Sequence, residues 1–225
     1  MIAHTKKFIA IAGNVGVGKS TLTGMIAERL GWEPFYEAVD DNPYLPDFYR
    51  DMRSWSFHSQ IFFLSRRLRH HRQLLDHPNS VVQDRSVYED AEVFARNLFR
   101  QGNMDQRDYD TYCDLYETMG RFLPPPDVVV YLRASVDTLL ERIRLRGREY
   151  ERDIDPKYLA QLNSLYSEWI DGFTASPVLI VPADELDFVA YGSHLDLIIS
   201  KIRERLEGKD HVVFLDEEID RVNGK

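Results

Sequence analysis

The sequence predicts an α/β fold in which helices cover both faces of a parallel β-sheet. Three observations predict it: short apolar runs recur along the chain, long segments with helical periodicity separate them, and a glycine-rich loop joins the first apolar run to the first helical segment. Strands that alternate with helices favour a parallel sheet, because each parallel pairing needs a crossover connection. At 225 residues, a single domain is expected.

Four of the predicted strands are well defined, and a fifth is shorter. The four cover residues 8–12, 80–84, 127–132 and 178–181, and the fifth covers 32–37, where Pro34 interrupts the pattern. Helices are predicted over residues 19–30, 53–76, 88–101, 105–122, 135–146, 156–172 and 193–206. These elements indicate one domain over residues 1–208, followed by a tail, 209–225, to which no role is assigned.

Charge and composition narrow the range of partners. A formal net charge of −9 gives the surface a negative field, which weakens any general attraction to nucleic acid or to an anionic membrane. The lone Cys113 cannot form a disulfide within the chain, and the apolar run near the N-terminus is too short for a signal sequence or a membrane span. We therefore expect a soluble cytoplasmic protein whose partner is a small molecule.

The glycine-rich loop at residues 13–20 reads GNVGVGKS, which matches the pattern G-x-x-x-x-G-K-[ST] between a strand and a helix. Its glycines allow backbone N–H groups to turn inward, and the helix N-terminus adds partial positive charge, so the loop suits the phosphates of a nucleoside triphosphate. Lys19 is expected to reach the β- and γ-phosphates, and Ser20 to ligate Mg²⁺. The residues predicted to bind the triphosphate here are Gly13, Asn14, Val15, Gly16, Val17, Gly18, Lys19, Ser20 and Thr21.

Two further candidates stand at the ends of predicted strands, where ligands bind in open parallel sheets. Glu37 closes the short strand, and a carboxylate there is placed to accept the proton of a hydroxyl nucleophile. Asp84, Arg85 and Ser86, called the DRS motif below, end and follow the strand at 80–84. Asp84 is a candidate Mg²⁺ ligand, and Arg85 a candidate to orient Glu37 or a phosphate. An Asp-Arg pair is also common as a surface ion pair, so the motif alone leaves both interpretations open.

Five segments stand in a fixed order along the chain: GNVGVGKS, YEAVDDNPYL, FYRDMRSWSFHSQIFFLSRR, DRSVYEDAEVFARNLF and RIRLRGREYE. In this order they resemble the deoxycytidine/deoxyguanosine kinase family of deoxynucleoside kinases, particularly its short bacterial deoxyadenosine/deoxyguanosine kinases. The resemblance runs from about residue 8 to about residue 206. It implies a P-loop kinase fold with an arginine-rich lid at about residues 142–153, ATP as phosphate donor with Mg²⁺, and a homodimer.

The resemblance also implies roles around the sugar. Glu37 would be the base that faces the 5′-hydroxyl, with Arg85 beside it. Tyr49 and Glu151 would hold the 3′-hydroxyl, although sequence alone favours surface positions for both. The arginines that would close over the donor phosphates are Arg142, Arg146 and Arg148.

For the nucleobase, the resemblance implies that Gln60 reads its edge and that Phe94 stacks on its face. An aromatic face plus a side-chain amide grips a flat base well, because the amide offers both a donor and an acceptor. Judged without the resemblance, Phe94 is equally typical of a core aromatic, and Gln60 of a solvated helix position.

The resemblance further implies that base preference is set by a base-facing arginine on the helix of Gln60, paired with Asp90, as in family members that take purines or cytosine. Helical spacing favours Arg67, because residues seven apart share a face, whereas the local string LSR leaves Arg66 as the alternative. Such a pair would crowd the methyl group of thymine. Asn42 stands where animal members carry tryptophan, which resembles the bacterial purine group.

The sequence therefore predicts an enzyme that phosphorylates the 5′-hydroxyl of a deoxynucleoside in nucleotide salvage, with deoxyadenosine or deoxyguanosine favoured and deoxycytidine also open. Two alternatives remain. A nucleoside monophosphate kinase similar to thymidylate kinase shares the loop, the sheet and the lid. A non-catalytic nucleotide-binding subunit could keep the fold without the chemistry.

Overall fold

The computed structural model describes residues 6–36, 42–148, 151 and 154–224, and it confirms the α/β fold with a five-stranded parallel sheet. The strands are β1 (Phe8–Gly13), β2 (Glu33–Phe35), β3 (Val81–Asp84), β4 (Val128–Arg133) and β5 (Val178–Pro182). Their order in the sheet is β2-β3-β1-β4-β5, and every pairing is parallel. Pro34 is tolerated in β2 because this strand lies at the edge of the sheet.

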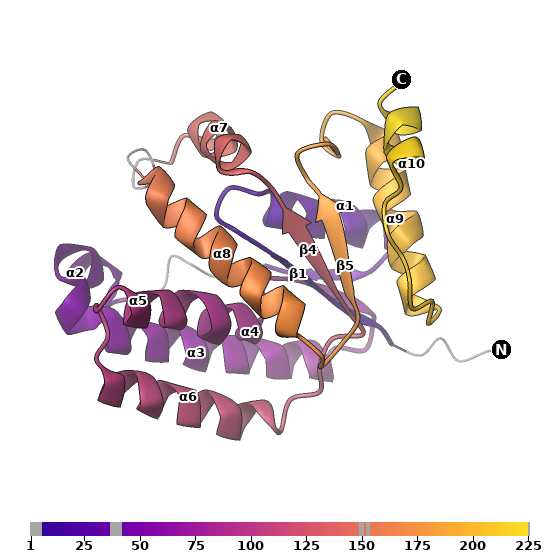
Figure 1. Cartoon of the computed structure of the whole chain (residues 1–225). Coiled ribbons are helices and arrows are strands. Elements are labelled where there is room, and N and C mark those ends of the chain that lie inside the picture. The colour runs from indigo at the N-terminus through magenta and orange to yellow at the C-terminus, as the bar shows by residue number, and fades with distance from the viewer. Residues whose placement is uncertain (1–5, 37–41, 149–150, 152–153, 225) are drawn as a thin grey trace.

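Helices pack on both faces of the sheet (Figure 1). They are α1 (Lys19–Leu30), α2 (Leu45–Arg50), α3 (Met52–Asp76), α4 (Val87–Glu89), the π-helix η1 (Asp90–Ala95), α5 (Arg96–Arg100), α6 (Gln106–Gly120), α7 (Val136–Arg146), α8 (Pro156–Gly172), α9 (Gly192–Leu206) and α10 (Asp216–Val222). The predicted helix 88–101 forms as one run, α4 to α5, but its middle six residues are π-helical. The sequence did not predict α2 or α10.

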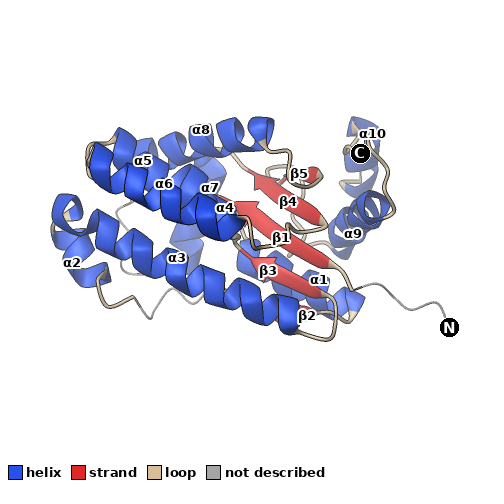
Figure 2. Cartoon of the chain, turned by 90° about the horizontal axis from the view of Figure 1, so that it is seen from below, coloured by secondary structure: helices blue, strands red, loops and turns tan. Residues whose placement is uncertain are grey.

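Successive residues of β1 point to opposite faces and so belong to different parts of the core. Ile9 and Ile11 pack with residues of α1, α7 and α9, whereas Ala12 packs with η1 and α8. Figure 2 shows the sheet between these layers, with α3, α6 and α8 on one side and α9 on the other. Because both faces are covered, the strands read as nearly continuous apolar runs.

The carboxyl ends of the strands form one edge of the sheet, and the predicted phosphate-binding loop lies there. This loop leaves β1 at Gly13 and leads into α1, while the DRS motif leaves β3 beside it. The backbone N–H of Arg85 donates to the carbonyl of Ile11 at 3.0 Å, which fixes the start of the DRS turn against β1. The topology therefore brings the glycine loop and the DRS motif together.

The tail at 209–225, whose role the sequence leaves open, adds a helix to the fold. Helix α10 packs on α9, and Ile219 is buried in the main core with only 5% of its surface exposed. Lys201 Nζ donates to Glu218 at 2.7 Å, and His194 Nε2 lies 3.2 Å from the carbonyl oxygen of Val222. The tail thus covers apolar surface of α9.

Over the described part of the chain, every helix is too short or too polar to cross a membrane.

Candidate active site

A cavity of about 690 Å³ opens at the carboxyl edge of the sheet. Its wall is built by the glycine loop, α2, α3, the DRS motif, the segment η1–α5 and the chain around the start of α8. The predicted site residues that line it are Val15, Gly16, Lys19, Ser20, Tyr49, Gln60, Asp84, Arg85, Phe94, Arg146, Arg148 and Glu151. Segments that lie more than a hundred residues apart in the sequence thus share one cavity.

The glycine loop is shaped by backbone conformations that only glycine adopts readily. Gly16 has φ +82°, and a Cβ atom there would lie 2.5 Å from the side chain of Ile143. Lys19 Nζ donates to the carbonyls of Gly13 at 2.8 Å and Asn14 at 3.0 Å. The buried Asn14 side chain in turn donates to Asn163 on α8 at 2.8 Å. These buried hydrogen bonds fix the loop against α8, and the N-terminus of α1 faces the cavity.

Ser20 and Asp84 meet across the cavity floor. The Ser20 hydroxyl donates to Asp84 Oδ2, while Asp84 Oδ1 is buried and has no hydrogen-bond partner within the described residues. A hydroxyl beside a carboxylate with a spare oxygen fits Mg²⁺, which prefers oxygen ligands and keeps waters and substrate phosphates in its shell. The described residues contain no cluster of three or more His, Cys, Asp or Glu that could hold a metal alone.

Arg85 combines an unusual backbone with an aromatic contact. Its φ of +63° lies in the left-handed region, where the backbone of a residue other than glycine is strained. Its guanidinium carbon lies 4.4 Å from the centroid of the Phe94 ring, a cation–π distance. The strained turn and the ring together fix the guanidinium at the cavity wall.

Arg67, rather than Arg66, forms the buried pair with Asp90. Arg67 Nε donates to Asp90 Oδ2 at 2.9 Å, and both side chains are 5% exposed. A second nitrogen of Arg67 lies 3.4 Å from the carbonyl of Arg85, so the pair also braces the DRS motif. Arg66 instead stands over the ring of Phe62. Neither Arg67 nor Asp90 is among the residues that line the cavity, so the predicted contact of this pair with the base stays a prediction.

The acceptor part of the wall is a mixture of amide and aromatic groups. Gln60 is buried and faces the cavity, whereas Tyr49 is 56% exposed at its rim. Two aromatic residues that the sequence did not single out, Phe63 and Tyr158, also line it. Burial raises the pKa of Tyr158 to about 12, so its hydroxyl remains a hydrogen-bond donor at neutral pH. Tyr158 belongs to no sequence motif. Only the packing of α8 brings it to the cavity.

Asn42 also takes part in shaping this wall. Its side chain is buried and donates to Ser59 on α3 at 3.0 Å, and its carbonyl accepts from the backbone of Tyr44 at 2.9 Å. Asn42 therefore fixes the entry to α2 against α3.

The lid arginines divide into two groups. Arg146 donates to Glu151, and Arg148 Nη1 lies 3.6 Å from Glu151 Oε1. Arg142 differs, because its two terminal nitrogens donate to the carbonyls of Val17 and Ala183, each at 2.7 Å. Arg146 and Arg148 therefore line the cavity, whereas Arg142 grips the backbone of the glycine loop.

Glu37, the predicted general base, lies outside the described residues. The described chain leads up to it through β2, whose Phe35 pairs with Gln83 in β3. The carboxyl end of β2 therefore lies at the same sheet edge as the DRS motif.

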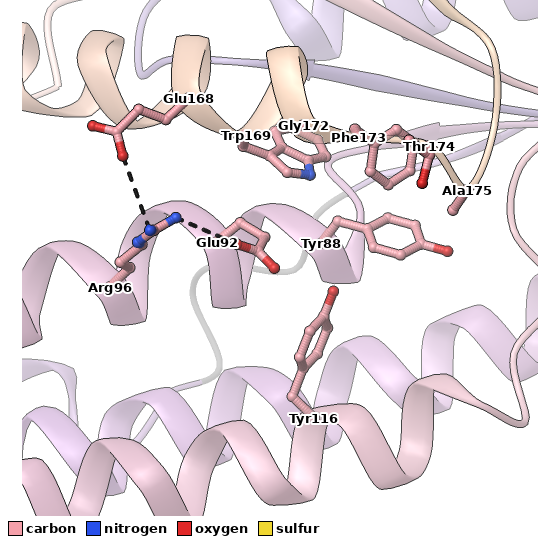
Figure 3. A pocket seen from close by; sticks show the side chains of 10 residues that line it. All are labelled: Tyr88, Glu92, Arg96, Tyr116, Glu168, Trp169, Gly172, Phe173, Thr174 and Ala175. Carbon is pink, nitrogen blue, oxygen red and sulfur yellow. Dashed lines mark ion pairs between the residues drawn. The ribbon is translucent and has the colours of Figure 1, made fainter.

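A second, more open pocket of about 390 Å³ lies between α8, the run from α4 to α5, and α6 (Figure 3). It is lined by Tyr88, Tyr116, Trp169 and Phe173, and by the Glu92–Arg96 ion pair. The segment 172–175 that borders it runs directly into β5, so it faces away from the glycine loop. We place the candidate active site in the larger cavity, because that cavity contains the phosphate-binding loop.

Comparison with known proteins identifies relatives of one kind. The family model described as Deoxynucleoside kinase matches residues 9–207. The chain is 41% identical over 196 residues to a deoxyadenosine/deoxycytidine kinase of Bacillus subtilis, covering 86% of this chain and 90% of that protein. It is 38% identical over 209 residues to a deoxyguanosine kinase of Lactobacillus johnsonii, covering 87% of this chain and 92% of that protein. A solved structure of deoxyadenosine kinase from M. mycoides with bound dATP superposes with a TM-score of 0.77 at 36% identity, covering 88% of this chain and 99% of that one.

Proposed function

Because the chain belongs to the deoxynucleoside kinase family, we propose that its main cavity transfers the γ-phosphoryl group of ATP to the 5′-hydroxyl of a purine deoxynucleoside. The chain is thus an enzyme, a phosphotransferase of nucleotide salvage. One observation carries the proposal: the phosphate-binding loop and a wall of amide and aromatic side chains line a single cavity of about 690 Å³. One half suits a triphosphate and the other suits a flat base.

On the donor side, Lys19 turns from the loop carbonyls toward the β- and γ-phosphates. Ser20 and Asp84 hold Mg²⁺, supported by the spare buried oxygen of Asp84. When bound, Mg²⁺ neutralises charge on the phosphate oxygens. The relatives named as kinases support ATP or a related triphosphate as the donor.

On the acceptor side, the base stacks on Phe94 and meets the amide of Gln60. Tyr49 and Glu151 bind the 3′-hydroxyl, and Glu37 accepts the proton of the 5′-hydroxyl as the phosphoryl group moves. Arg85, held over the Phe94 ring, lies between base and phosphate and stabilises the developing charge.

For the lid, we propose that Arg146 and Arg148 exchange part of their contact with Glu151 for the donor phosphates. Glu151 is then released toward the sugar. Arg142 keeps the Val17 carbonyl in place and so shapes the loop that those phosphates occupy.

For the base, we propose that the Arg67–Asp90 pair presents a polar surface to its edge once a deoxynucleoside is bound. A polar surface suits the edge of adenine or guanine, and it offers no apolar space for the thymine methyl group. The names of the relatives, which include kinases for deoxyadenosine, deoxyguanosine and deoxycytidine, support the same direction.

Two expectations from the resemblance belong to the proposal as well. We propose a homodimer in the cytoplasm, with the interface on the long helices. Sedimentation equilibrium tests the assembly, and a monomer at micromolar concentration would contradict it.

The deciding experiment measures phosphate transfer from ATP to a panel of deoxynucleosides, ribonucleosides and deoxynucleoside monophosphates. We expect deoxyadenosine or deoxyguanosine to be the best acceptor and thymidine to be poor. Faster transfer to dAMP than to deoxyadenosine would favour a nucleoside monophosphate kinase. An absence of transfer to every acceptor, from a folded protein that binds ATP, would favour the non-catalytic subunit.

The role of Glu37 is tested by Glu37→Gln, which keeps the size of the side chain and removes its basicity. General-base catalysis is worth roughly 10²–10⁴-fold, and we expect kcat for deoxyadenosine to fall by about that factor. Near-wild-type turnover by a folded Glu37→Gln protein would show that another group takes the proton.

A further inference from the structure

Glu89 is a completely buried carboxyl group beneath the glycine loop, and the motifs above give it no role. It ends α4, has no exposed surface, and lies outside the lining of the cavity. A carboxyl group in such a place is costly unless it is neutral or fully hydrogen-bonded, so its contacts define what it does.

Glu89 contacts both catalytic segments at once. Its Oε2 accepts from the backbone N–H of Ser86 in the DRS motif at 2.8 Å. Its Oε1 accepts from the backbone N–H of Gly13, the first residue of the glycine loop, at 3.2 Å. The two oxygens of one side chain therefore bind the start of the phosphate-binding loop and the start of α4.

Tyr166 of α8 completes the arrangement. Its hydroxyl oxygen lies 2.8 Å from Glu89 Oε1 and also 2.8 Å from the carbonyl oxygen of Gly13. The same carbonyl accepts from Lys19 at 2.8 Å. Tyr166 and Lys19 together thus satisfy both lone pairs of the Gly13 carbonyl.

Counting protons favours a neutral Glu89. The two short O···O contacts of Tyr166 each need a proton, but the tyrosine brings one and the Gly13 carbonyl brings none. With an ionised Glu89, the single phenol proton has to be shared between the two oxygens. With a neutral Glu89, both contacts are full hydrogen bonds, because Glu89 donates to Tyr166 while Tyr166 donates to Gly13. Burial raises the pKa of the Glu89 carboxyl, and the nearby cations of Lys19 and Arg85 oppose this.

We propose that Glu89 is a positioning residue which, as a neutral acid and together with Tyr166, locks the glycine loop to the DRS motif. The lock keeps the Gly13 carbonyl satisfied when Lys19 leaves it for a phosphate. A neutral Glu89 also leaves the positive charges of Lys19 and Arg85 to the phosphates, whereas an ionised carboxylate would draw both toward itself. This inference rests on the proposed kinase function.

The charged and titratable groups that face Glu89 come from four elements. They are Lys19 at the start of α1, Arg85 in the DRS motif, Tyr131 on β4 and Tyr166 on α8. Because both tyrosine pKa values are raised by burial, to about 12 for Tyr131 and well above 10 for Tyr166, both phenols stay protonated at neutral pH. A neutral Glu89 is the state that fits this surrounding.

The test compares Glu89→Gln with Glu89→Met and Tyr166→Phe. Glutamine keeps a donor toward Tyr166 and an acceptor for Ser86, and it loses only the longer, 3.2 Å bond from the Gly13 N–H, so Glu89→Gln should hold kcat/KM for ATP within about 5-fold of the wild type. Glu89→Met and Tyr166→Phe should each lower it by roughly 10- to 100-fold, with KM for the deoxynucleoside unchanged. The double variant should lose little more than either single variant, because both break one network.

Glu92→Gln is the matched control, since Glu92 lies on the next turn and faces the second pocket. We expect it to leave kcat/KM for ATP unchanged. If Glu89→Gln loses as much activity as Glu89→Met, an ionised carboxylate is required and the proposal fails. It also fails if Glu89→Met matches the wild type, or if KM for the deoxynucleoside rises as much as KM for ATP.

A second measurement does not depend on activity or on the folding of Glu89→Met. The infrared difference spectrum between the wild type and Glu89→Gln at neutral pH should contain the C=O band of a protonated carboxylic acid. A carboxylate band in its place would overturn the neutral state. Failure of the kinase function itself is recognised separately, because the wild type would then phosphorylate no deoxynucleoside while this band could still be observed.

Discussion

The glycine loop and the lid bind the same phosphates in the proposed mechanism, but they are held in place by opposite means. The loop is fixed by buried bonds to backbone groups, with Lys19 only 8% exposed and Asn14 2% exposed. The lid is fixed by ion pairs whose arginines reach solvent, with the Arg146 and Arg148 side chains 36% and 47% exposed and that of their partner Glu151 10% exposed. Buried bonds to backbone contribute to folding, whereas ion pairs of solvent-exposed arginines contribute about 0–1 kcal/mol.

The difference predicts how the two regions respond to substitution. A change in or under the loop should lower stability and activity together. A change in the lid should lower activity while stability stays constant. Activity and the free energy of unfolding, measured on the same variants, therefore separate the two regions.

The largest effect is expected for Lys19→Met, which removes the loop cation and the donor to Gly13 and Asn14. Cations that neutralise a transferring phosphoryl group are worth about 10³–10⁵ in rate, and kcat should fall by that order. The free energy of unfolding should fall by about 1–2 kcal/mol, as measured by urea denaturation. Lys157→Met, on an exposed position of α8, should change neither quantity. A loss of activity smaller than 10-fold would show that Lys19 does not stabilise the transferring phosphoryl group.

The next largest effect concerns the Arg67–Asp90 pair, whose side chains are as fully buried as those of the loop residues Lys19 and Asn14. Arg67→Leu takes away the guanidinium and should cost about 3–5 kcal/mol of unfolding free energy. Adding Asp90→Leu should restore most of this, because no buried carboxylate then lacks its cation. The double variant should also use thymidine better relative to deoxyadenosine. An unchanged ratio of thymidine to deoxyadenosine use would show that the pair does not determine base preference.

Arg146→Gln tests the lid, and its effect should be confined to activity. Losing one stabiliser of transition-state charge costs about 10²–10³-fold, and we expect kcat to fall by that factor. The free energy of unfolding should change by less than about 1 kcal/mol. Arg144→Gln, two residues away on another face of α7 and exposed, is the control. A loss confined to deoxynucleoside affinity would contradict the assignment of Arg146 to the donor phosphates.

The smallest effect concerns the loss of stability in acid, which we assign to a residue outside both the loop and the lid. His71 is buried on α3, and this burial lowers its pKa below the ordinary 6.5. The unfolded chain therefore binds a proton before the folded chain does, so stability is complete above pH 6.5 and declines as the pH falls below it. His71→Phe should flatten this decline in denaturation curves between pH 7 and pH 5. An unchanged slope would assign the acid sensitivity to other groups.

Local sequence predicted the parts of the molecule that depend on local rules. The glycine loop, all five strands and the helix containing Gln60 follow from turn chemistry and hydrophobic periodicity. Helical spacing favoured Arg67 over Arg66, and Arg67 forms the ion pair with Asp90, while its contact with the base stays a prediction. The resemblance supplied the cavity-lining residues Tyr49, Gln60, Phe94, Arg146, Arg148 and Glu151, because each stands in a recognisable segment.

The parts that the sequence did not predict depend on contacts between distant segments. Glu89 and Tyr166 are 77 residues apart and carry no motif, so only the packing of α8 against α4 joins them. The separate position of Arg142 follows from the carbonyls of Val17 and Ala183, which no pattern places beside α7. Helix α10 lacked a signal because its apolar residues are few and cover only part of α9.

The left-handed backbone of Arg85 has a consequence for directed evolution. Glycine adopts φ +63° without strain, so Arg85→Gly should relieve the turn while it removes the guanidinium from the cavity. A library selected only for heat resistance would therefore enrich a variant that has lost the arginine we propose to be catalytic, whereas one selected for turnover would retain the strain. At this position the chain trades thermal tolerance for chemistry, and a stabilised version of the enzyme has to gain its stability elsewhere.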